Sequence, residues 1–180
     1  RVVRVLESLG HAVEEGAAFD GTIEEFLPMF TFMVRGMMVP SVSGLQPTTR
    51  WLRELGRGVR FEDAMARREL FRERVDRSFE GVDLWVTPTV AKLPPRVGVW
   101  QGVAPERLFG EAALLGAFTA VFNASGNPAT SVPVWPGEGA LPVGVQLAAP
   151  RGEDVRALAT ARAVLDALGT PLVPLAPGVW

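Results

Sequence analysis

Residues 122–133 read FNASGNPATSVP and place an Asn, a Ser, a Gly and a Pro between two apolar stretches. The preceding ALLGAFTAV (residues 113–121) has the composition of a buried helix, and the following PVGVQLAA (residues 142–149) has that of a buried strand. Glycine reaches backbone conformations closed to other residues, and proline cannot continue a helix. We therefore predict a tight helix-to-strand turn in which Gly126 and Pro128 have structural roles.

Hydrophobic spacing and capping residues define the elements on either side of this turn. Thr22 and Glu25 form a capping-box pattern ahead of a long apolar helix that contains Pro28, and Pro105 suits the first turn of another helix. Gly10 is a C-terminal cap for the first helix. The predicted helices span residues 2–9, 23–39, 46–58, 61–79, 105–122 and 153–168, and the predicted strands span 11–16, 83–87, 130–134 and 143–149.

Helices and strands alternate along the chain, and two of the strands are apolar on both faces. Helices cover such strands on each side, so we expect an α/β fold in which the strands are part of a mixed β-sheet layered with helices. The 180 residues form one unit, 1–180, without a second domain. The stretch 112–122 is nearly all apolar, and we expect its helix to be buried on every side.

The composition excludes several classes of function. A net charge of −2 and an isoelectric point near 5.5 give no field that attracts nucleic acid or an anionic membrane. The chain has no cysteine and a single histidine, His11, so we expect no metal site and no histidine-based triad. No motif indicates a cofactor. Without a signal segment or an apolar run long enough to span a membrane, the protein is expected to be cytoplasmic.

Two features leave alternatives open. The Met- and Phe-rich helix at 23–39 fits core packing, and it also fits an apolar slot for a ligand. No serine lies in a Gly-x-Ser-x-Gly motif, and a Ser–Lys pair would have to join Ser125 to the single lysine, Lys92. Nothing in the sequence brings these two residues together.

Four stretches, in chain order, resemble the amidase signature family. They are LESLGHAVEE (6–15), LQPTTRWLRELGRG (45–58), GVDLWVTPTVAKLPPRVG (81–98) and FTAVFNASGNPATSVPVWPGEGALPVGVQLAAP (118–150). The acidic pair Glu153-Asp154 then opens the last helix, as in that family. The chain is thus similar to the C-terminal portion of a bacterial amidase.

The resemblance implies hydrolysis of small-molecule amides by a Ser–Ser–Lys triad in a segment that would precede residue 1. This chain has no Ser-Ser pair and no Gly-Gly pair, so it would carry no catalytic residue, and Ser125 would not be the nucleophile. It would contribute sheet, core and part of the substrate cleft, and it would pair with the missing N-terminal amidase part or self-associate as a homo-oligomer. Asn123 can satisfy carbonyls at its helix end. The expected cleft residues are Thr87, Thr89, Phe118, Thr119 and Asn123.

Two other functions are compatible with these residues. The first is a stand-alone, non-catalytic module that keeps the amidase C-terminal fold for binding or assembly. The second is the glutamine-hydrolysing component of a tRNA-dependent amidotransferase. In those proteins, a stretch resembling LADIFT supplies an Asp that binds the substrate's amino group, whereas LLGAFT here places Gly116 at that position. The resemblance therefore implies a preference for neutral or apolar amides over glutamine.

Overall fold

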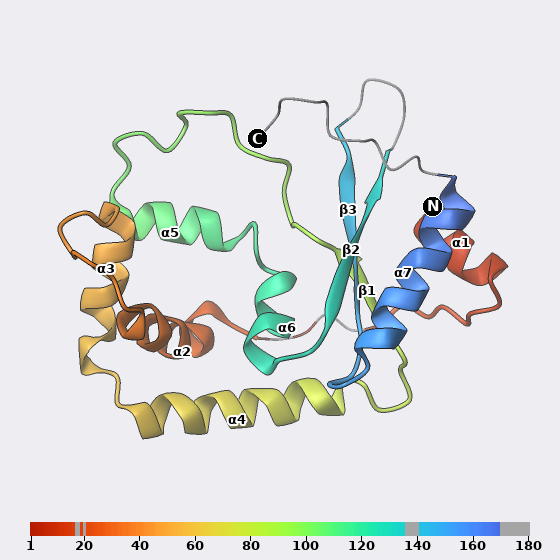
Figure 1. The fold of residues 1–180 in the computed structure, drawn as a ribbon, viewed down its shortest axis with the longest axis horizontal. Coiled ribbons are helices and arrows are strands. Elements are labelled where there is room, and N and C mark those ends of the chain that lie inside the picture. Colours follow the sequence, from red (N-terminus) through yellow and green to blue (C-terminus); the bar gives the residue numbers. More distant parts are fainter. Residues whose placement is uncertain (17–18, 20, 136–140, 170–180) are drawn as a thin grey trace.

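The computed structural model describes residues 1–16, 19, 21–135 and 141–169. Helices dominate this part of the chain (Figure 1). The α-helices are α1 (Val2–Ser8), α2 (Ile23–Gly36), α3 (Pro47–Leu55), α4 (Phe61–Arg77), α5 (Pro105–Ala113), α6 (Thr119–Ser125) and α7 (Asp154–Leu168), and a short 3-10 helix, η1 (Gly56–Gly58), follows α3. The strands are β1 (Trp85–Pro88), β2 (Ala129–Val134) and β3 (Val143–Ala148).

The three described strands form one sheet with the order β1-β3-β2. Both pairs are antiparallel, and Ala148 of β3 lies opposite Trp85 on one side and Ala129 on the other. The α/β class is confirmed, but the expected mixed pairing is not found among the described strands. The predicted strand at 11–16 is also wrong, because this segment hydrogen-bonds with no neighbouring strand, although Val13 packs against the core.

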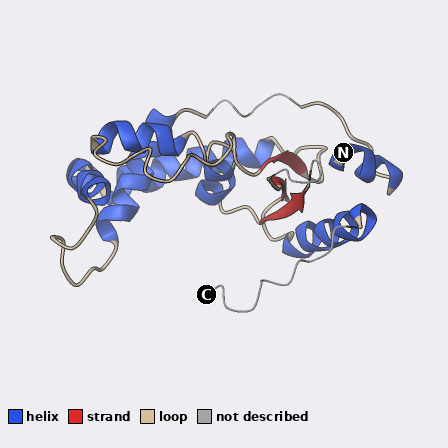
Figure 2. Cartoon of the chain, turned by 90° about the horizontal axis from the view of Figure 1, so that it is seen from above, coloured by secondary structure: helices blue, strands red, loops and turns tan. Residues whose placement is uncertain are grey.

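Two hydrophobic clusters lie on opposite faces of the sheet, which separates α1 and α7 from the group formed by α2 to α6 (Figure 1, Figure 2). Successive strand residues point to opposite faces, so Leu147 packs in one cluster and its neighbour Ala148 in the other. Of the two strands predicted to be apolar on both faces, β3 therefore contributes to both clusters, whereas β2 contributes only to the first and exposes Ala129 and Ser131 on its other face. The first cluster also contains Val2, Leu6, Val132, Val134, Ala161 and Val164, and the second contains Met29, Phe71, Val75, Phe79 and Phe122.

The capping residues place most helix ends where the sequence predicts them. Thr22 accepts a hydrogen bond from the Glu25 N–H at 3.4 Å at the start of α2, which runs through Pro28. Pro105 occupies the first turn of α5. Gly10 and Gly169 take left-handed conformations, with φ of 90° and 58°, after α1 and α7.

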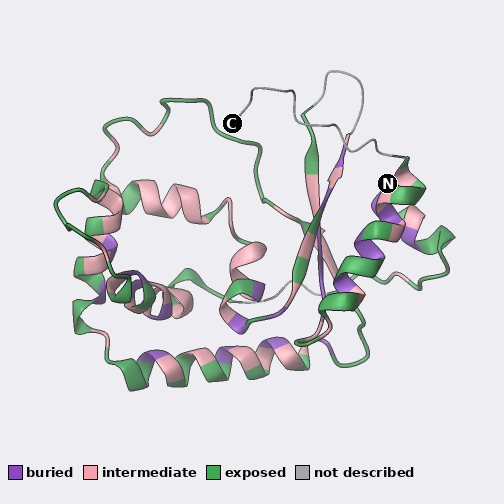
Figure 3. Cartoon of the chain, viewed as in Figure 1, coloured by how far each residue is buried: buried purple, intermediate pink, exposed green. Residues whose placement is uncertain are grey.

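The long apolar helix expected at 105–122 is instead two helices, α5 and α6, joined by a turn at 114–118. Two 3-10-type hydrogen bonds, each between residues three positions apart, tighten the end of α5. The Leu115 N–H donates to the Ala112 carbonyl, and the Gly116 N–H donates to the Ala113 carbonyl. The expectation of complete burial is also wrong, since α5 contains no fully buried residue and Leu114 is half exposed (Figure 3). The uncovered faces border a pocket.

None of the helices in the described ranges combines the length and apolarity that crossing a bilayer requires.

Candidate functional site

The turn between α6 and β2 is built on a glycine in the left-handed conformation. Gly126 has φ 83° and ψ 27°, and the N–H groups of Gly126 and Asn127 both donate to the Phe122 carbonyl, at 2.9 and 3.0 Å. This arrangement ends α6 and reverses the chain. Pro128 then leads directly into β2, and its carbonyl accepts the Ala149 N–H at 2.9 Å.

Ser125 and Asn127 form a buried polar pair inside this turn. The Ser125 hydroxyl, which is fully buried, lies 2.6 Å from Asn127 Oδ1, and Asn127 Nδ2 donates to the Ala149 carbonyl at 2.9 Å. Asn123 is the residue expected to satisfy carbonyls near the helix end, but it is exposed, and the Phe122 carbonyl there accepts the backbone N–H groups of Gly126 and Asn127 instead. The sequence signal for Asn127 is its position directly after the left-handed glycine, where a helix leaves carbonyls without partners.

Gln146, which none of the sequence motifs identifies, connects two of the predicted cleft residues. Its side chain is almost fully buried in β3, and Nε2 donates to Thr87 Oγ1 at 3.0 Å and to the Phe118 carbonyl at 3.2 Å. This polar side chain ties the turn at 114–118 to the sheet. A glutamine in the middle of an apolar strand is the signal that could have identified it.

Thr89 lies just beyond the end of β1. Its N–H donates to the Gly144 carbonyl at 2.8 Å, and its hydroxyl lies 2.6 Å from Ser131 Oγ. A Cβ on Gly144 would lie 2.7 Å from Thr89 Oγ1, so only glycine fits beside this pair of hydroxyls. Thr89 is therefore part of a polar contact at one end of the sheet.

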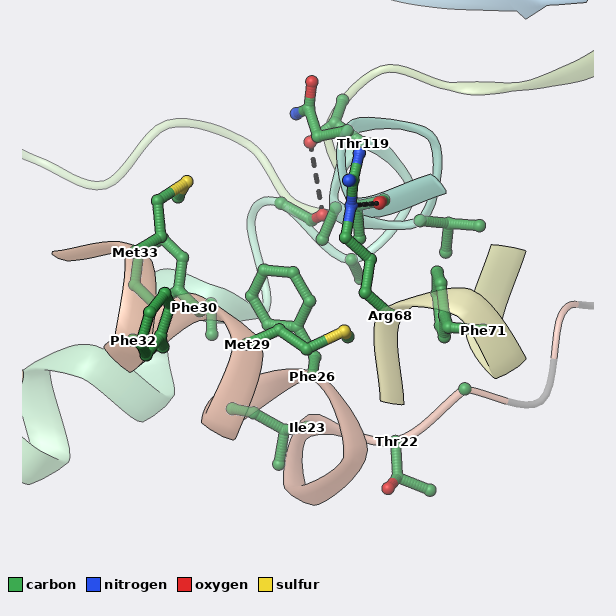
Figure 4. Close-up of a pocket in the computed structure, with 18 of the residues that line it drawn as sticks. Thr22, Ile23, Phe26, Met29, Phe30, Phe32, Met33, Arg68, Phe71 and Thr119 are labelled. Carbon is green, nitrogen blue, oxygen red and sulfur yellow. Dashed lines mark hydrogen bonds between the residues drawn. The ribbon is translucent and has the colours of Figure 1, made fainter. Parts of the chain in front are cut away.

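A pocket of about 930 Å³ lies between α2, α4, α5 and α6, and includes the turn at 114–117 (Figure 4). Two predicted cleft residues, Thr119 and Asn123, line it. Thr87, Thr89 and Phe118 do not, so the five predicted residues fall into two places in the structure. The volume lies within the range of natural ligand pockets.

Aromatic and methionine side chains of α2 form the apolar side of the pocket. Phe26 stacks on Phe30 with ring centroids 5.4 Å apart, and Phe30 stacks on Phe109 of α5 at 5.8 Å. Met29 is buried in the core, whereas Met33 is 58% exposed. Core packing therefore explains only part of the Met- and Phe-rich helix, and the rest lines a space that an apolar ligand can enter.

Contacts with the neighbouring helices hold α2 in place at this pocket. Arg53 donates to the Val34 carbonyl at 2.8 Å near the end of α2, and Glu25 near its start pairs with Arg74 of α4 at 2.6 Å. A Cβ on Gly56 would lie 2.5 Å from the Thr31 carbonyl oxygen, so this glycine lets η1 approach the α2 backbone closely. The apolar side of the pocket is thus fixed at both ends of α2.

The polar side chains that line the pocket are few. Thr22 lies at the start of α2, Thr119 and Asn123 lie on α6, and Arg68 reaches across from α4. The Thr119 hydroxyl donates to the Gly116 carbonyl at 3.2 Å, and Arg68 Nε donates to the Ala124 carbonyl at 3.1 Å. The described lining residues include no Asp or Glu.

Charged and hydroxyl groups elsewhere form no nucleophile–base pair with these residues. Lys92 is exposed on the loop before α5, whereas Ser125 bonds within the interior turn, so the Ser–Lys alternative is not formed. The hydrogen bond from Arg107 has the largest effect in lowering the pKa of Glu111, and the hydrogen bond from Trp100 lowers it further. Glu111 lies on α5 and does not line the pocket. In the described part of the chain, no three His, Cys, Asp or Glu residues gather as metal ligands.

Comparison with known proteins relates this fold to one group of enzymes. The sequence model of the family described as Amidase matches residues 41–158, which is more than half of the chain. AmiC of Mycobacterium tuberculosis, a protein assigned to the amidases, is 33% identical over 103 residues, or 57% of this chain and 22% of AmiC. The 6-aminohexanoate-cyclic-dimer hydrolase of Paenarthrobacter ureafaciens is 34% identical over 90 residues, or 45% of this chain and 18% of the hydrolase.

Solved structures show the same fold over nearly the whole chain. The structure of a 6-aminohexanoate cyclic dimer hydrolase has a TM-score of 0.72 and 22% sequence identity, and the alignment covers 93% of this chain and 40% of the hydrolase. A crystal structure of an amidase gives a TM-score of 0.70 at 22% identity, over 93% of this chain and 41% of that protein. The chain thus spans about a fifth of the length of the curated relatives and about two fifths of the solved structures. By its matched residues, the chain belongs to the Amidase family.

Proposed function

We propose that this chain is the C-terminal portion of an amidase that hydrolyses the carbon–nitrogen bond of small-molecule amides. A Ser–Ser–Lys triad outside residues 1–180 would form a covalent serine ester with the acyl group, which water then releases. Family membership supports this proposal, and so does the partial coverage of the relatives. Ser125 is unsuited to the nucleophile's role because its hydroxyl is buried and bonded to Asn127.

One observation carries the role of this chain in substrate binding. The sequence 118–133, part of a stretch that resembles the family, contains α6 and the turn into β2, and α6 forms one wall of the 930 Å³ pocket. The pocket is therefore proposed as part of the substrate cleft, with Thr119 and Asn123 in its lining. Thr87, Thr89 and Phe118 are proposed as supports of that wall, since Gln146 links two of them to the sheet.

The lining favours apolar amides over glutamine. Gly116, at the position where the resemblance places a substrate-binding Asp in glutamine-hydrolysing members, lines the pocket, and no described lining residue carries a carboxylate. A missing charge-assisted hydrogen bond costs roughly 1.5–3 kcal/mol of binding free energy, which corresponds to about a ten- to hundredfold loss of affinity. Apolar amides have no amino group for such a carboxylate to bind, so its absence does not weaken their binding. Their apolar chains also contact the side chains of α2.

The sheet offers two edges to the remainder of such an enzyme. Among the described strands, β1 and β2 each pair only with β3, so each has one side without a partner strand. An unpaired edge readily adds another strand. We propose that the missing N-terminal amidase part covers at least one of these edges. A cytoplasmic location, self-association and the lack of nucleic-acid, membrane and cofactor partners stay predictions from the sequence.

The test is to join this chain to the protein segment encoded directly upstream of it and to measure amide hydrolysis. We expect the joined protein to hydrolyse an apolar anilide and to react with a serine-directed fluorophosphonate at a residue outside 1–180. Ser125→Ala in the joined protein should leave both results unchanged, and kcat/KM should be lower for glutamine than for the apolar amide. Hydrolysis by residues 1–180 alone that is lost in Ser125→Ala would overturn the proposal.

A further inference from the structure

Arg68 places a single positive charge at the side of the apolar pocket. The residue lies on α4, and its side chain extends between α4 and α6 (Figure 4). Its Nε donates to the Ala124 carbonyl at 3.1 Å, and its Nη2 lies 3.8 Å from the position that a Cβ on Gly126 would occupy. The guanidinium is therefore oriented by α6 through one of its five N–H groups.

The edge formed by Nη1 and Nη2 has no partner in the described part of the chain. Two other arginines of α4 are paired, Arg72 with Glu69 at 2.9 Å and Arg74 with Glu25 at 2.6 Å. Arg68 forms no such ion pair, and the described residues that line the pocket include no acid that could supply one. A half-buried cation beside apolar surface is stabilised by an anionic partner.

We infer that the pocket binds an amphipathic carboxylate, whose apolar chain lies against α2 and whose carboxylate is held by the Nη edge of Arg68. A guanidinium presents two parallel N–H donors that match the two oxygens of a carboxylate. Because Nε is already bonded to Ala124, the free edge sets where the carboxylate lies. In terms of the proposed function, on which this step rests, the enzyme accepts amides with an apolar chain and prefers those whose chain ends in a carboxylate.

A purely structural role for Arg68 predicts a different outcome. A cation that only bonds a carbonyl in the last turn of α6 stabilises the helix end, and its removal lowers stability without changing which ligand binds. A ligand-binding role changes the ratio of affinities for charged and neutral ligands of the same chain length. This ratio is independent of a uniform loss of stability, so it separates the two roles.

The experiment measures, by isothermal titration calorimetry, the affinity of residues 1–180 for three probes: decanoate, decanamide and decylamine. We expect decanoate to bind at least about tenfold more tightly than decanamide, and decylamine to bind most weakly. Arg68→Met should bring decanoate and decanamide to within about twofold, and Arg68→Lys should keep part of the difference. Arg67→Met is the matched control, because Arg67 is an exposed neighbour that does not line the pocket. This change should leave the difference in affinity between decanoate and decanamide unaltered.

Equal affinity of the unaltered chain for decanoate and decanamide would overturn the inference, and this comparison needs no variant to fold. A preference that persists in Arg68→Met would do the same, as would the failure of all three probes to bind. The proposed amidase activity is tested separately in the joined protein, with decanamide and the monoamide of decanedioic acid as substrates. Binding without hydrolysis there would contradict the proposed function and leave the carboxylate site standing.

Discussion

Asn127 Nδ2 donates to the carbonyl of Ala149 at 2.9 Å, and this bond fixes the turn after α6 to the residue that follows β3. Oδ1 of the same side chain lies 2.6 Å from the Ser125 hydroxyl. Two segments that are separate in the sequence, the turn after α6 and the end of β3, therefore share one buried amide. Since α6 forms a wall of the pocket, the position of that wall depends on this bond.

Replacing Asn127 with Ala should destabilise the chain markedly. The change leaves the buried Ala149 carbonyl without its donor, which costs about 1–3 kcal/mol of unfolding free energy, whereas the Ser125 hydroxyl can still donate to the Val121 carbonyl at 2.9 Å. We expect a loss of about 1–3 kcal/mol, measured by urea denaturation. Asn123→Ala, at an exposed asparagine on the preceding helix α6, should change stability by less than about 0.5 kcal/mol. Equal effects of the two changes would contradict the assignment.

The sequence predicts those elements that local chemistry decides. Thr22 and Pro105 mark helix starts, Gly10 and Gly126 mark left-handed turns, and the alternation in β3 distributes Leu147 and Ala148 to opposite faces. Each of these signals involves residues within a few positions of one another. They therefore appear in the sequence without knowledge of the packing.

Features that depend on long-range packing were not predictable in this way. The break between α5 and α6 depends on Gln146, which bonds the Phe118 carbonyl from a strand 28 residues away. The burial of Asn127 rather than Asn123 depends on its bond to Ala149, 22 residues further along the chain. Predicted cleft residues such as Thr87 and Thr119 separate because one belongs to the sheet and the other to the pocket wall.

Adding a methyl group at Gly144 should disturb the end of the sheet. A Cβ there would lie 2.7 Å from Thr89 Oγ1 and 2.9 Å from Ser131 Oγ, too close for either neighbour to stay in place. Gly144→Ala should therefore lower the unfolding free energy by about 1–3 kcal/mol. Gly110→Ala, in α5 with nothing within 4 Å of its Cβ position, should instead raise it by about 0.5–1 kcal/mol. Thermal unfolding of the two variants is the measurement, and shifts of the same sign would show that the space around these glycines does not decide their effects.

The loop before α5 should be held to that helix by Glu111 in a pH-dependent manner. Arg107 Nε donates to one oxygen of Glu111 at 3.0 Å, and Trp100 Nε1 donates to the other at 2.9 Å, which lowers the pKa of Glu111 below its ordinary value. A carboxyl with a lowered folded-state pKa stabilises the folded state above its unfolded pKa, and that contribution is lost as the pH falls through the folded pKa.

We expect the Trp100 indole N–H resonance to shift on acidification with a midpoint below that of an ordinary glutamate. Glu111→Gln should remove the transition, while Glu106→Gln, on the first turn of the same helix, should leave it in place. A midpoint above the ordinary glutamate value in the unaltered chain would show that the two donors do not act on the ionised carboxylate.

Residues 1–180 by themselves should self-associate through the loops that follow α2 and β1. Met38 and Val97 are fully exposed there, and Leu93 is 71% exposed, so apolar side chains meet solvent on two parts of the chain. Apolar patches beyond a few hundred Å² are rare on monomers and mark contacts with other molecules. Sedimentation velocity should show concentration-dependent dimers or larger species that persist at high salt, because apolar contacts are not screened. Combined Met38→Ser and Val97→Ser changes should shift the distribution to monomer, whereas Val155→Ser, an exposed apolar residue on α7, should leave it unchanged. If Val155→Ser disperses the protein as well as the loop changes do, the contact surface lies on α7 and the loops are not the site of association.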